Sequence, residues 1–256
     1  MTPSSSPANS KNHQHCIQYG HWLEKMIRMF QKMVLQKMYS IIFILKGLNI
    51  IISNTLVFIY LNIKHLQIKT IGITDGVEKV DDIIETVNHF RCFDYILKIA
   101  DKELSEDIIK HIHLLLKSGT TDSQKEWFAV GDYKKRPNVI GDMIETTHPS
   151  KVPAAIKSLL KDYRENSNIT FEDIIDFHYK FEKIHPFQDG NGRVGRLIMF
   201  KECLKNNICP FIIDDTMKDY YRRGLNEYND EKGYLLETCH ASQDEYKKLL
   251  EYFEYI

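Results

Sequence analysis

Apolar residues recur at helical spacing over most of the chain beyond residue 71. Residues 81–100 alternate apolar and polar positions with a period of about 3.6, which predicts an amphipathic helix. The same pattern predicts further helices over residues 105–116, 153–163, 171–184, 193–205, 214–228 and 231–253. Residues 127–144 instead combine apolar pairs with turn residues such as Gly131 and Gly141, which predicts short strands or a hairpin. The expected fold is mainly α, a helical bundle with a short β-hairpin.

Polar residues support two of these helix starts. Ser105 is followed by two acids, which suit the positive N-terminal end of a helix. Thr170 and Asp173 have the spacing of a capping box before the helix over 171–184. That helix is therefore expected to end at His185.

The first 79 residues have a different character. Residues 1–20 are rich in Ser, Asn and His without periodic apolar positions, which predicts a disordered lead. Residues 47–63 carry no charge, but three asparagines and a serine make them a poor membrane span, and a buried core segment is favoured. We therefore expect a lead over 1–20, an atypical and largely helical region over 21–79, and the main domain over 80–256.

Charge and cysteine content narrow the function classes. The net charge of −1 combines +7 over residues 1–70 with −8 over residues 71–256, where bases and acids are interleaved, so nucleic-acid binding is not expected. Five scattered cysteines without a CxxC pair favour a reducing compartment over a disulfide scaffold or a zinc site. No signal-peptide pattern is present in the polar first 18 residues. The expected location is the cytoplasm, with membrane association through 47–63 as the minor alternative.

The stretch that carries chemistry is 185–196, with the sequence HPFQDGNGRVGR. Glycines around Asn191 let consecutive backbone N–H groups converge, and the helix that follows adds its positive end, which together predict an anion site. Arg193 and Arg196 lie three residues apart on the first turn of that helix and can bind phosphate oxygens.

Two further side chains of this stretch suggest a reaction. Asp189 would repel a phosphate unless a divalent metal lay between them, and Mg²⁺ commonly bridges phosphates to one carboxylate. His185 is the nearby group that can accept a proton near neutral pH. Together these groups indicate transfer of a phosphate-containing group to a hydroxyl. A glycine turn or a single His is more often structural, but the combined spacing over twelve residues favours the chemical interpretation.

At this point the chain resembles a known family. Residues 185–196 match every fixed position of the Fic-family motif HxFx(D/E)GNGRxxR, and the resemblance covers roughly residues 80–250. It implies a Fic-type helical bundle and transfer of AMP from ATP to a Ser, Thr or Tyr hydroxyl of a target protein. It also implies His185 as the base, Asp189 as the Mg²⁺ ligand and Phe187 as a core anchor. The residues that it assigns to phosphate binding are Gly190, Asn191, Gly192, Arg193 and Arg196.

The resemblance extends beyond the motif. Residues 131–141 look like the family's G-x-Y-R strand and target-docking flap, with Lys134 in place of the usual Arg. The implied flap residues, which would bind an extended target by strand addition, are Val139, Ile140 and Gly141. Tyr221 and Asn229 resemble residues that line the family's adenine and ribose pocket, although aromatic core packing explains them equally well.

The departure from the family lies upstream. Many relatives carry an inhibitory [S/T]xxxE[G/N] helix whose Glu pairs with the second motif arginine, here Arg196. Residue Ile52 stands where one alignment would place that Glu, and Thr74 and Glu78 are followed by Lys79 instead of Gly or Asn. Either inhibition is lost or comes from a partner chain, or residues 1–70 are not the family's usual N-terminal region.

Two alternative functions stay open. The same loop could remove AMP or transfer another phosphate-containing group, although the missing inhibitory Glu and the presence of Gly192 favour neither. The chain could also be a non-catalytic ATP-binding regulatory module. Under the leading hypothesis the partners are ATP, Mg²⁺ and a target protein, a homodimer is compatible, and membrane contact is disfavoured.

Overall fold

The structure is a computed structural model that describes residues 80–140 and 144–252. The predictions for 1–20, 21–79, the uncharged stretch 47–63 and the upstream inhibitory motif lie outside the described residues, as does Gly141 of the flap. Within the described ranges, no helix is long and apolar enough to cross a membrane.

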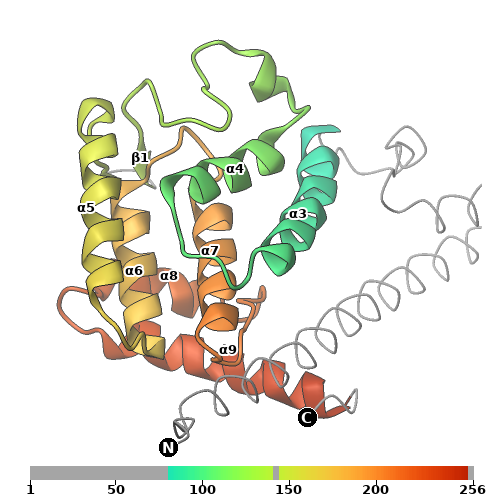
Figure 1. Cartoon of the computed structure of the whole chain (residues 1–256), viewed down its shortest axis with the longest axis vertical. Helices are drawn as coiled ribbons and strands as arrows, with labels where there is room; N and C mark the ends of the chain where they lie inside the picture. The colour runs from blue at the N-terminus through green and yellow to red at the C-terminus, as the bar shows by residue number, and fades with distance from the viewer. Residues whose placement is uncertain (1–79, 141–143, 253–256) are drawn as a thin grey trace, which may run out of the picture. The chain divides into compact units, whose positions relative to one another are not determined.

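The described part is mainly helical, which confirms the predicted fold class. With the labels of Figure 1, its α-helices are α3 (Val80–Lys98), α4 (Glu106–Lys117), α5 (Val152–Glu165), α6 (Phe171–Ile184), α7 (Asn191–Lys205), α8 (Lys218–Glu227) and α9 (Gly233–Tyr252). Two short 3₁₀ turns, Thr121–Gln124 and Pro149–Lys151, and the strands β1 (Val139–Ile140) and β2 (Ile144–Glu145) complete the described elements.

The predicted capping signals form as hydrogen bonds. The Ser105 hydroxyl accepts a bond from the backbone N–H of Ile108 at 3.3 Å and begins α4. At the start of α6, the Asp173 N–H donates to the Thr170 hydroxyl at 3.2 Å, and the Thr170 N–H donates to the Asp173 carboxylate at 2.8 Å. These bonds satisfy amides that the helices themselves cannot pair, so both starts agree with the sequence.

Helix α7 lies at the centre of the fold, beside α6 on one side and α3 and α4 on the other (Figure 1). It carries buried side chains around its whole circumference, as expected for a helix enclosed by others. Its buried apolar residues are Val194, Leu197, Ile198, Met199, Phe200, Cys203 and Leu204. Because α6 runs toward the end of the bundle where α7 begins, the loop between them lies at that end.

The hairpin is much shorter than the prediction over 127–144. Only Val139–Ile140 and Ile144–Glu145 pair, antiparallel, with Ile140 opposite Ile144. Side-chain bonds close its base instead of a longer ladder, since the Lys134 ammonium donates to the Asn138 side-chain oxygen at 2.7 Å and to the Thr146 hydroxyl at 2.6 Å. Residues 127–137 take turns and bends, so the predicted short strands form only at the end of that range.

Candidate active site

His185 stands at the end of α6 in a conformation that favours a base. It takes a left-handed backbone conformation with φ of 51°, and its N–H donates to the Phe181 carbonyl at 3.0 Å, which ends the helix. Its Nδ1 lies 3.3 Å from the Glu182 carbonyl, and because a carbonyl only accepts, Nδ1 carries the proton. Burial lowers the pKa of His185 to about 4. The imidazole is therefore neutral near pH 7, with a lone pair on Nε2.

Asn191 and Phe187 hold the loop closed. The Phe187 N–H donates to the Asn191 side-chain oxygen at 2.7 Å, and the Asn191 amide donates back to the Phe187 carbonyl at 2.8 Å. The Asn138 amide reaches the same carbonyl at 2.9 Å and so ties the hairpin base to the loop. The side chain of Asn191 thus forms its hydrogen bonds within the loop. The predicted contact of Asn191 with a phosphate would therefore be made by its backbone N–H.

The first turn of α7 lies where the sequence predicts an anion site. The helix begins at Asn191, two residues earlier than the sequence pattern suggested, because Gly190 takes the N-cap position with φ of 82°. The first intrahelical bond runs from the Val194 N–H to the Gly190 carbonyl at 3.0 Å. The amides of Asn191 and Gly192 therefore have no helical acceptor and lie at the positive end of the helix.

Helix α4 packs against the loop through an aromatic stack and two polar contacts. The His113 ring stacks on Phe187 with centroids 4.0 Å apart. Its Nδ1 accepts a bond from the Gly131 N–H at 2.9 Å, so Nε2 carries the proton and donates to the Asp189 carbonyl at 3.2 Å. One turn later, the ammonium of Lys117 lies 2.8 Å from Oδ2 of Asp189.

The two motif arginines turn to different neighbours. Arg193 forms ion pairs with Glu85 of α3 and, at 3.1 Å, with Asp189. The guanidinium carbon of Arg196 lies 5.8 Å from the centre of the Tyr221 ring, a cation–π contact. Each arginine is thus held at the loop by groups that a phosphate would have to join or displace.

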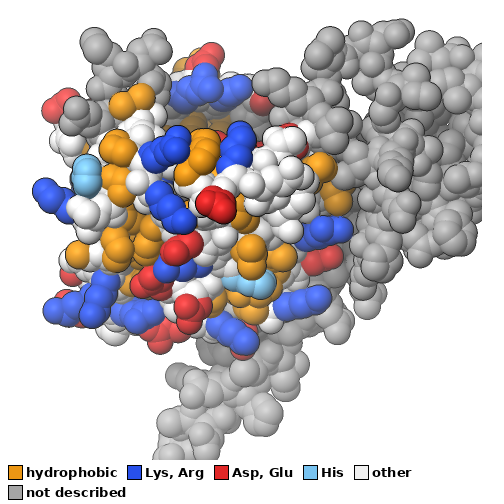
Figure 2. Space-filling view, turned by 90° about the horizontal axis from the view of Figure 1, so that it is seen from above, with side chains coloured by type: hydrophobic (Ala, Val, Ile, Leu, Met, Phe, Trp, Pro, Cys, Tyr) orange, Lys and Arg blue, Asp and Glu red, His pale blue; other side chains and the backbone are white. Residues whose placement is uncertain are grey.

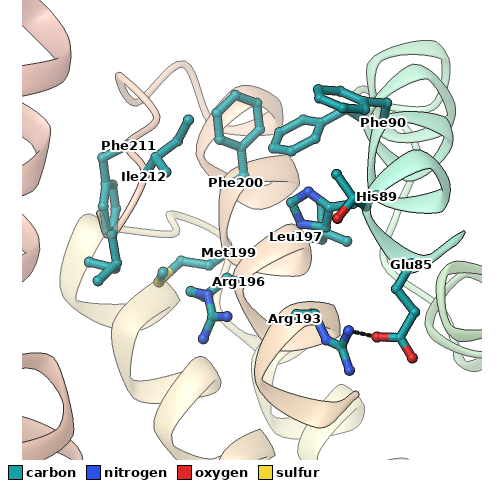
Figure 3. A pocket seen from close by; sticks show the side chains of 13 residues that line it. Glu85, His89, Phe90, Arg193, Arg196, Leu197, Met199, Phe200, Phe211 and Ile212 are labelled. Atoms are coloured by element: carbon teal, nitrogen blue, oxygen red, sulfur yellow. Dashed lines mark ion pairs between the residues drawn. The ribbon is translucent and has the colours of Figure 1, made fainter. Parts of the chain in front are cut away.

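Both guanidinium groups nevertheless line one cleft between α3, α7 and residues 211–213. The cleft has a volume of about 450 Å³, within the range of about 300–1,000 Å³ that small-molecule sites occupy. Figure 3 shows Arg193 and Glu85 facing each other across one end of it. The apolar residues of its lining are Phe90, Phe93, Leu197, Met199, Phe200, Phe211 and Ile212, and Figure 3 shows Phe90 and Phe200 at the end away from the Arg193–Glu85 pair.

Tyr221 and Asn229, predicted for the nucleotide pocket, line no wall of this cleft. Tyr221 is 6% exposed, and its hydroxyl lies 2.6 Å from Nε2 of His178. Asn229 is exposed and accepts a bond from the Tyr179 hydroxyl at 2.9 Å. Tyr221 therefore meets the motif through Arg196, and direct contact of either residue with a nucleotide stays a prediction.

A buried carboxylate, Glu182, lies behind the loop. It is 9% exposed, and its Oε1 has no hydrogen-bond partner among the residues that the structure describes. Burial raises the pKa of Glu182 to about 7, while the charge of Arg196 acts in the opposite direction. It packs against Gly195, where an added Cβ would lie 2.5 Å from Oε1.

The predicted loop residues thus come together, whereas several supporting residues have no signal in the sequence. Glu85, His113, Lys117 and Glu182 reach the site from three different helices. The sequence shows that these residues are polar, but it does not show which neighbouring helix or loop their side chains contact. Of the predicted flap, Val139 is 55% exposed and so accessible to a partner.

Figure 2 shows the end of the bundle where α6 ends and α7 begins. Several Lys and Arg side chains lie close together near the middle of this surface. Asp and Glu side chains lie among and around this group. The loop end of the bundle thus presents both signs of charge, with the basic side chains close together at its middle.

The donor set at the loop fits a magnesium ion. Asp189 presents a side chain that is 51% exposed, and Mg²⁺ usually takes one or two protein carboxylates together with phosphates and waters. The structure describes no cluster of three or more His, Cys, Asp or Glu that would form an all-protein metal cage. A cation held by Asp189 would therefore depend on a phosphate ligand.

Comparison with known proteins agrees with this geometry. Residues 103–203 match the model of the Fic/DOC family, and this range holds the entire loop. This segment of the chain is therefore similar to Fic/DOC domains. The chain is 29% identical over 152 residues to a protein of Aquifex aeolicus named a probable protein adenylyltransferase, which covers 56% of this chain and 47% of the relative. This chain thus spans about half the length of that relative.

Solved Fic structures share the fold. A Fic domain-containing signaling protein from Bacteroides thetaiotaomicron aligns with a TM-score of 0.55 and 25% identity, over 73% of this chain and 72% of that one. Fic-1 of Caenorhabditis elegans aligns with a TM-score of 0.59 and 19% identity, over 82% of this chain and 66% of that one. The helical arrangement around the loop is therefore that of the family.

Proposed function

We propose that this protein transfers AMP from ATP to a hydroxyl of a target protein, with a catalytic domain that spans residues 80–256. The observation that carries the proposal is that one loop joins the unprotonated Nε2 of His185, the free amides at the start of α7 and two arginines. The name of the Aquifex relative, a probable protein adenylyltransferase, supports AMP as the transferred group.

The proposed reaction assigns one role to each part of the loop. His185 Nε2 accepts the proton of the target hydroxyl as its oxygen attacks the α-phosphorus of ATP. A bond forms between that oxygen and phosphorus, and the bond from the α-phosphorus to the β-phosphate oxygen breaks, so pyrophosphate leaves. The backbone amides at the start of α7, with Arg193 and Arg196, stabilise negative charge on the phosphates.

Asp189 would hold Mg²⁺ beside those phosphates. When bound, the cation supplies charge neutralisation and orientation of the triphosphate. The half-exposed Asp189 side chain and its place next to the helix start support this assignment. Without such a cation, the carboxylate would oppose binding of a triphosphate.

The hairpin would dock the target. Val139 is exposed, and the strand pair is short enough to leave edge groups for an extended target segment. Asn138 links this hairpin to the Phe187 carbonyl, so a segment bound there would be held at a constant position relative to His185. Ile140 and Gly141 complete the proposed docking surface.

The direct test is transfer of label from α-labelled ATP to protein, in a lysate or to the chain itself. We expect Mg²⁺-dependent labelling by the wild-type chain and a loss of about 10²–10⁴-fold in His185→Ala, as removal of a general base produces. Because the pKa of His185 is about 4, labelling by the wild type should stay level from pH 8 down to about 5.

A matched control is His240→Ala. His240 lies on α9 and stacks on Phe171, at the opposite end of α6 from His185, so labelling should be unchanged. Comparison of ATP with GTP, UTP and CDP-choline as labelled donors separates AMP transfer from transfer of other groups. If the folded wild-type chain binds Mg-ATP but labels no protein with any donor, the proposed activity is wrong.

A further inference from the structure

The starting observation is a lysine that is almost fully enclosed. Lys117 on α4 is 1% exposed, and the structure describes three carboxylates around its ammonium. It forms an ion pair with Glu85, lies 3.2 Å from Asp122, and lies 2.8 Å from Asp189. A buried charge requires pairing, and Glu85 and Asp122 already provide it. The third contact reaches 72 residues along the chain to the one carboxylate of the catalytic loop.

His113, one helical turn before Lys117, holds the same loop residue at a second point. Residues four apart lie on one helix face, and this face lies under the loop: an added Cβ at Gly190 would meet Leu116, His113 and Lys117 within 4 Å. His113 donates to the Asp189 carbonyl at 3.2 Å, and Lys117 donates to its carboxylate at 2.8 Å. The main chain and the side chain of Asp189 are therefore both tied to α4.

These contacts determine which oxygen of the Asp189 carboxylate remains available to a ligand. Oδ2 of Asp189 accepts from Lys117 at 2.8 Å and from Arg193 at 3.1 Å. Within the described ranges, both side-chain hydrogen bonds to this carboxylate reach Oδ2, and none reaches Oδ1. A half-exposed Asp side chain would otherwise rotate freely, so α4 selects one orientation of it.

We propose that His113 and Lys117 are positioning residues, which orient Asp189 so that Oδ1 is the oxygen offered to a divalent cation on a bound nucleotide. This inference rests on the proposed function, since it takes Asp189 as the cation ligand. Groups that hold a metal ligand in place typically change metal affinity by about 10–100-fold when they are removed. Lys117 contacts Oδ2 and so leaves Oδ1 to the cation, while Glu85 and Asp122 keep its ammonium in place.

The test measures binding and not transfer. Mn²⁺ serves as the cation, detected by its paramagnetic resonance signal, in the presence of an ATP analogue with a methylene group between its α- and β-phosphates. In Lys117→Met, which keeps the apolar stem without the charge, the Mn²⁺ Kd should rise by about 10–100-fold. Affinity for the analogue without a cation should change much less.

The chain contains a matched control for the loss of a buried lysine. Lys201 on α7 is also fully buried, with Glu202 at 2.7 Å and the Lys102 carbonyl as partners, almost three helical turns after the start of α7. Lys201→Met should lower the melting temperature as Lys117→Met does but leave the Mn²⁺ Kd unchanged. A role of Lys117 in stability alone predicts the same Mn²⁺ Kd in both variants.

A second variant keeps the inference testable if Lys117→Met does not fold. His113→Phe retains the ring that stacks on Phe187 but loses the bonds to Gly131 and Asp189, and should also weaken Mn²⁺ binding. An unchanged or lower Mn²⁺ Kd in a folded Lys117→Met or His113→Phe chain overturns the inference. If the wild type itself does not bind Mn²⁺ with the analogue, the proposed function fails first, and the two failures are distinguishable.

Discussion

At the scale of single residues, burial sets the protonation of two groups at the end of α6. His185 has its pKa lowered to about 4, so it is neutral and able to accept a proton at physiological pH. Glu182, three residues earlier, has its pKa raised to about 7, because the same burial disfavours its charged form. Burial thus prepares the proposed base, and it makes the ionised form of Glu182 costly to the folded state.

Replacement of Glu182 by Gln should reveal that cost as a function of pH. With its pKa raised from 4.5 to about 7, the folded state binds a proton more tightly than the unfolded state. The stability of the wild type therefore falls as pH rises from 4.5 to 7, by at most about 3 kcal/mol. Glu182→Gln should melt at a higher temperature than the wild type at pH 8 and at nearly the same temperature at pH 4.5. An equal difference at both pH values would contradict this explanation.

At the scale of elements, α6 packs tightly against α7 at Gly195. An added Cβ there would lie 2.5 Å from Glu182 Oε1 and 2.9 Å from Cε1 of His178. The absence of a side chain at Gly195 lets these two polar groups pack against α7. Gly195 lies on the first turns of α7, and Glu182 lies one turn before His185, so this contact joins the two helices close to the loop.

Gly195→Ala should therefore destabilise the protein, although alanine is the better helix former by about 1 kcal/mol. The clash is expected to cost about 1–3 kcal/mol, as overpacking does in other cores. Urea denaturation of the single variant measures the loss. In the double variant Glu182→Ala with Gly195→Ala, part of the loss should be recovered, and strict additivity of the two changes would show that Glu182 is not the obstacle.

At the scale of the whole molecule, the chain divides into parts of opposite charge. Residues 1–70 carry +7 and residues 71–256 carry −8. All described residues of the site, from Glu85 to Tyr221, belong to the acidic part, although its loop end presents Lys and Arg (Figure 2). Neither candidate stretch upstream of α3 places a glutamate with the inhibitory spacing and the required Gly or Asn after it.

A shortened chain that begins at residue 71 should consequently bind the methylene ATP analogue with Mg²⁺ as tightly as the full chain. Calorimetric titration of both chains makes the comparison. Tighter binding by the shortened chain, by more than about tenfold, would mean that residues 1–70 inhibit the site. Weaker binding by the same factor would mean that they contribute to it.

The sequence alone determined the features that depend on neighbours within about four residues. The capping box of Thr170 and Asp173 is such a feature, and so is the loop from His185 to Arg196, closed by a side chain four residues from its partner. Local bonds need only the right residues at the right spacing, and these are visible in one dimension.

The tertiary structure decided which distant residues serve that loop. Lys117 and His113 looked like polar positions on an ordinary amphipathic helix, and only packing of α4 under the loop brings them to Asp189, 72 and 76 residues away. The same holds for Glu182 against Gly195 and for the base of the hairpin, where Lys134 joins Asn138 to Thr146. Such contacts arise from which helix faces meet, which local periodicity does not specify.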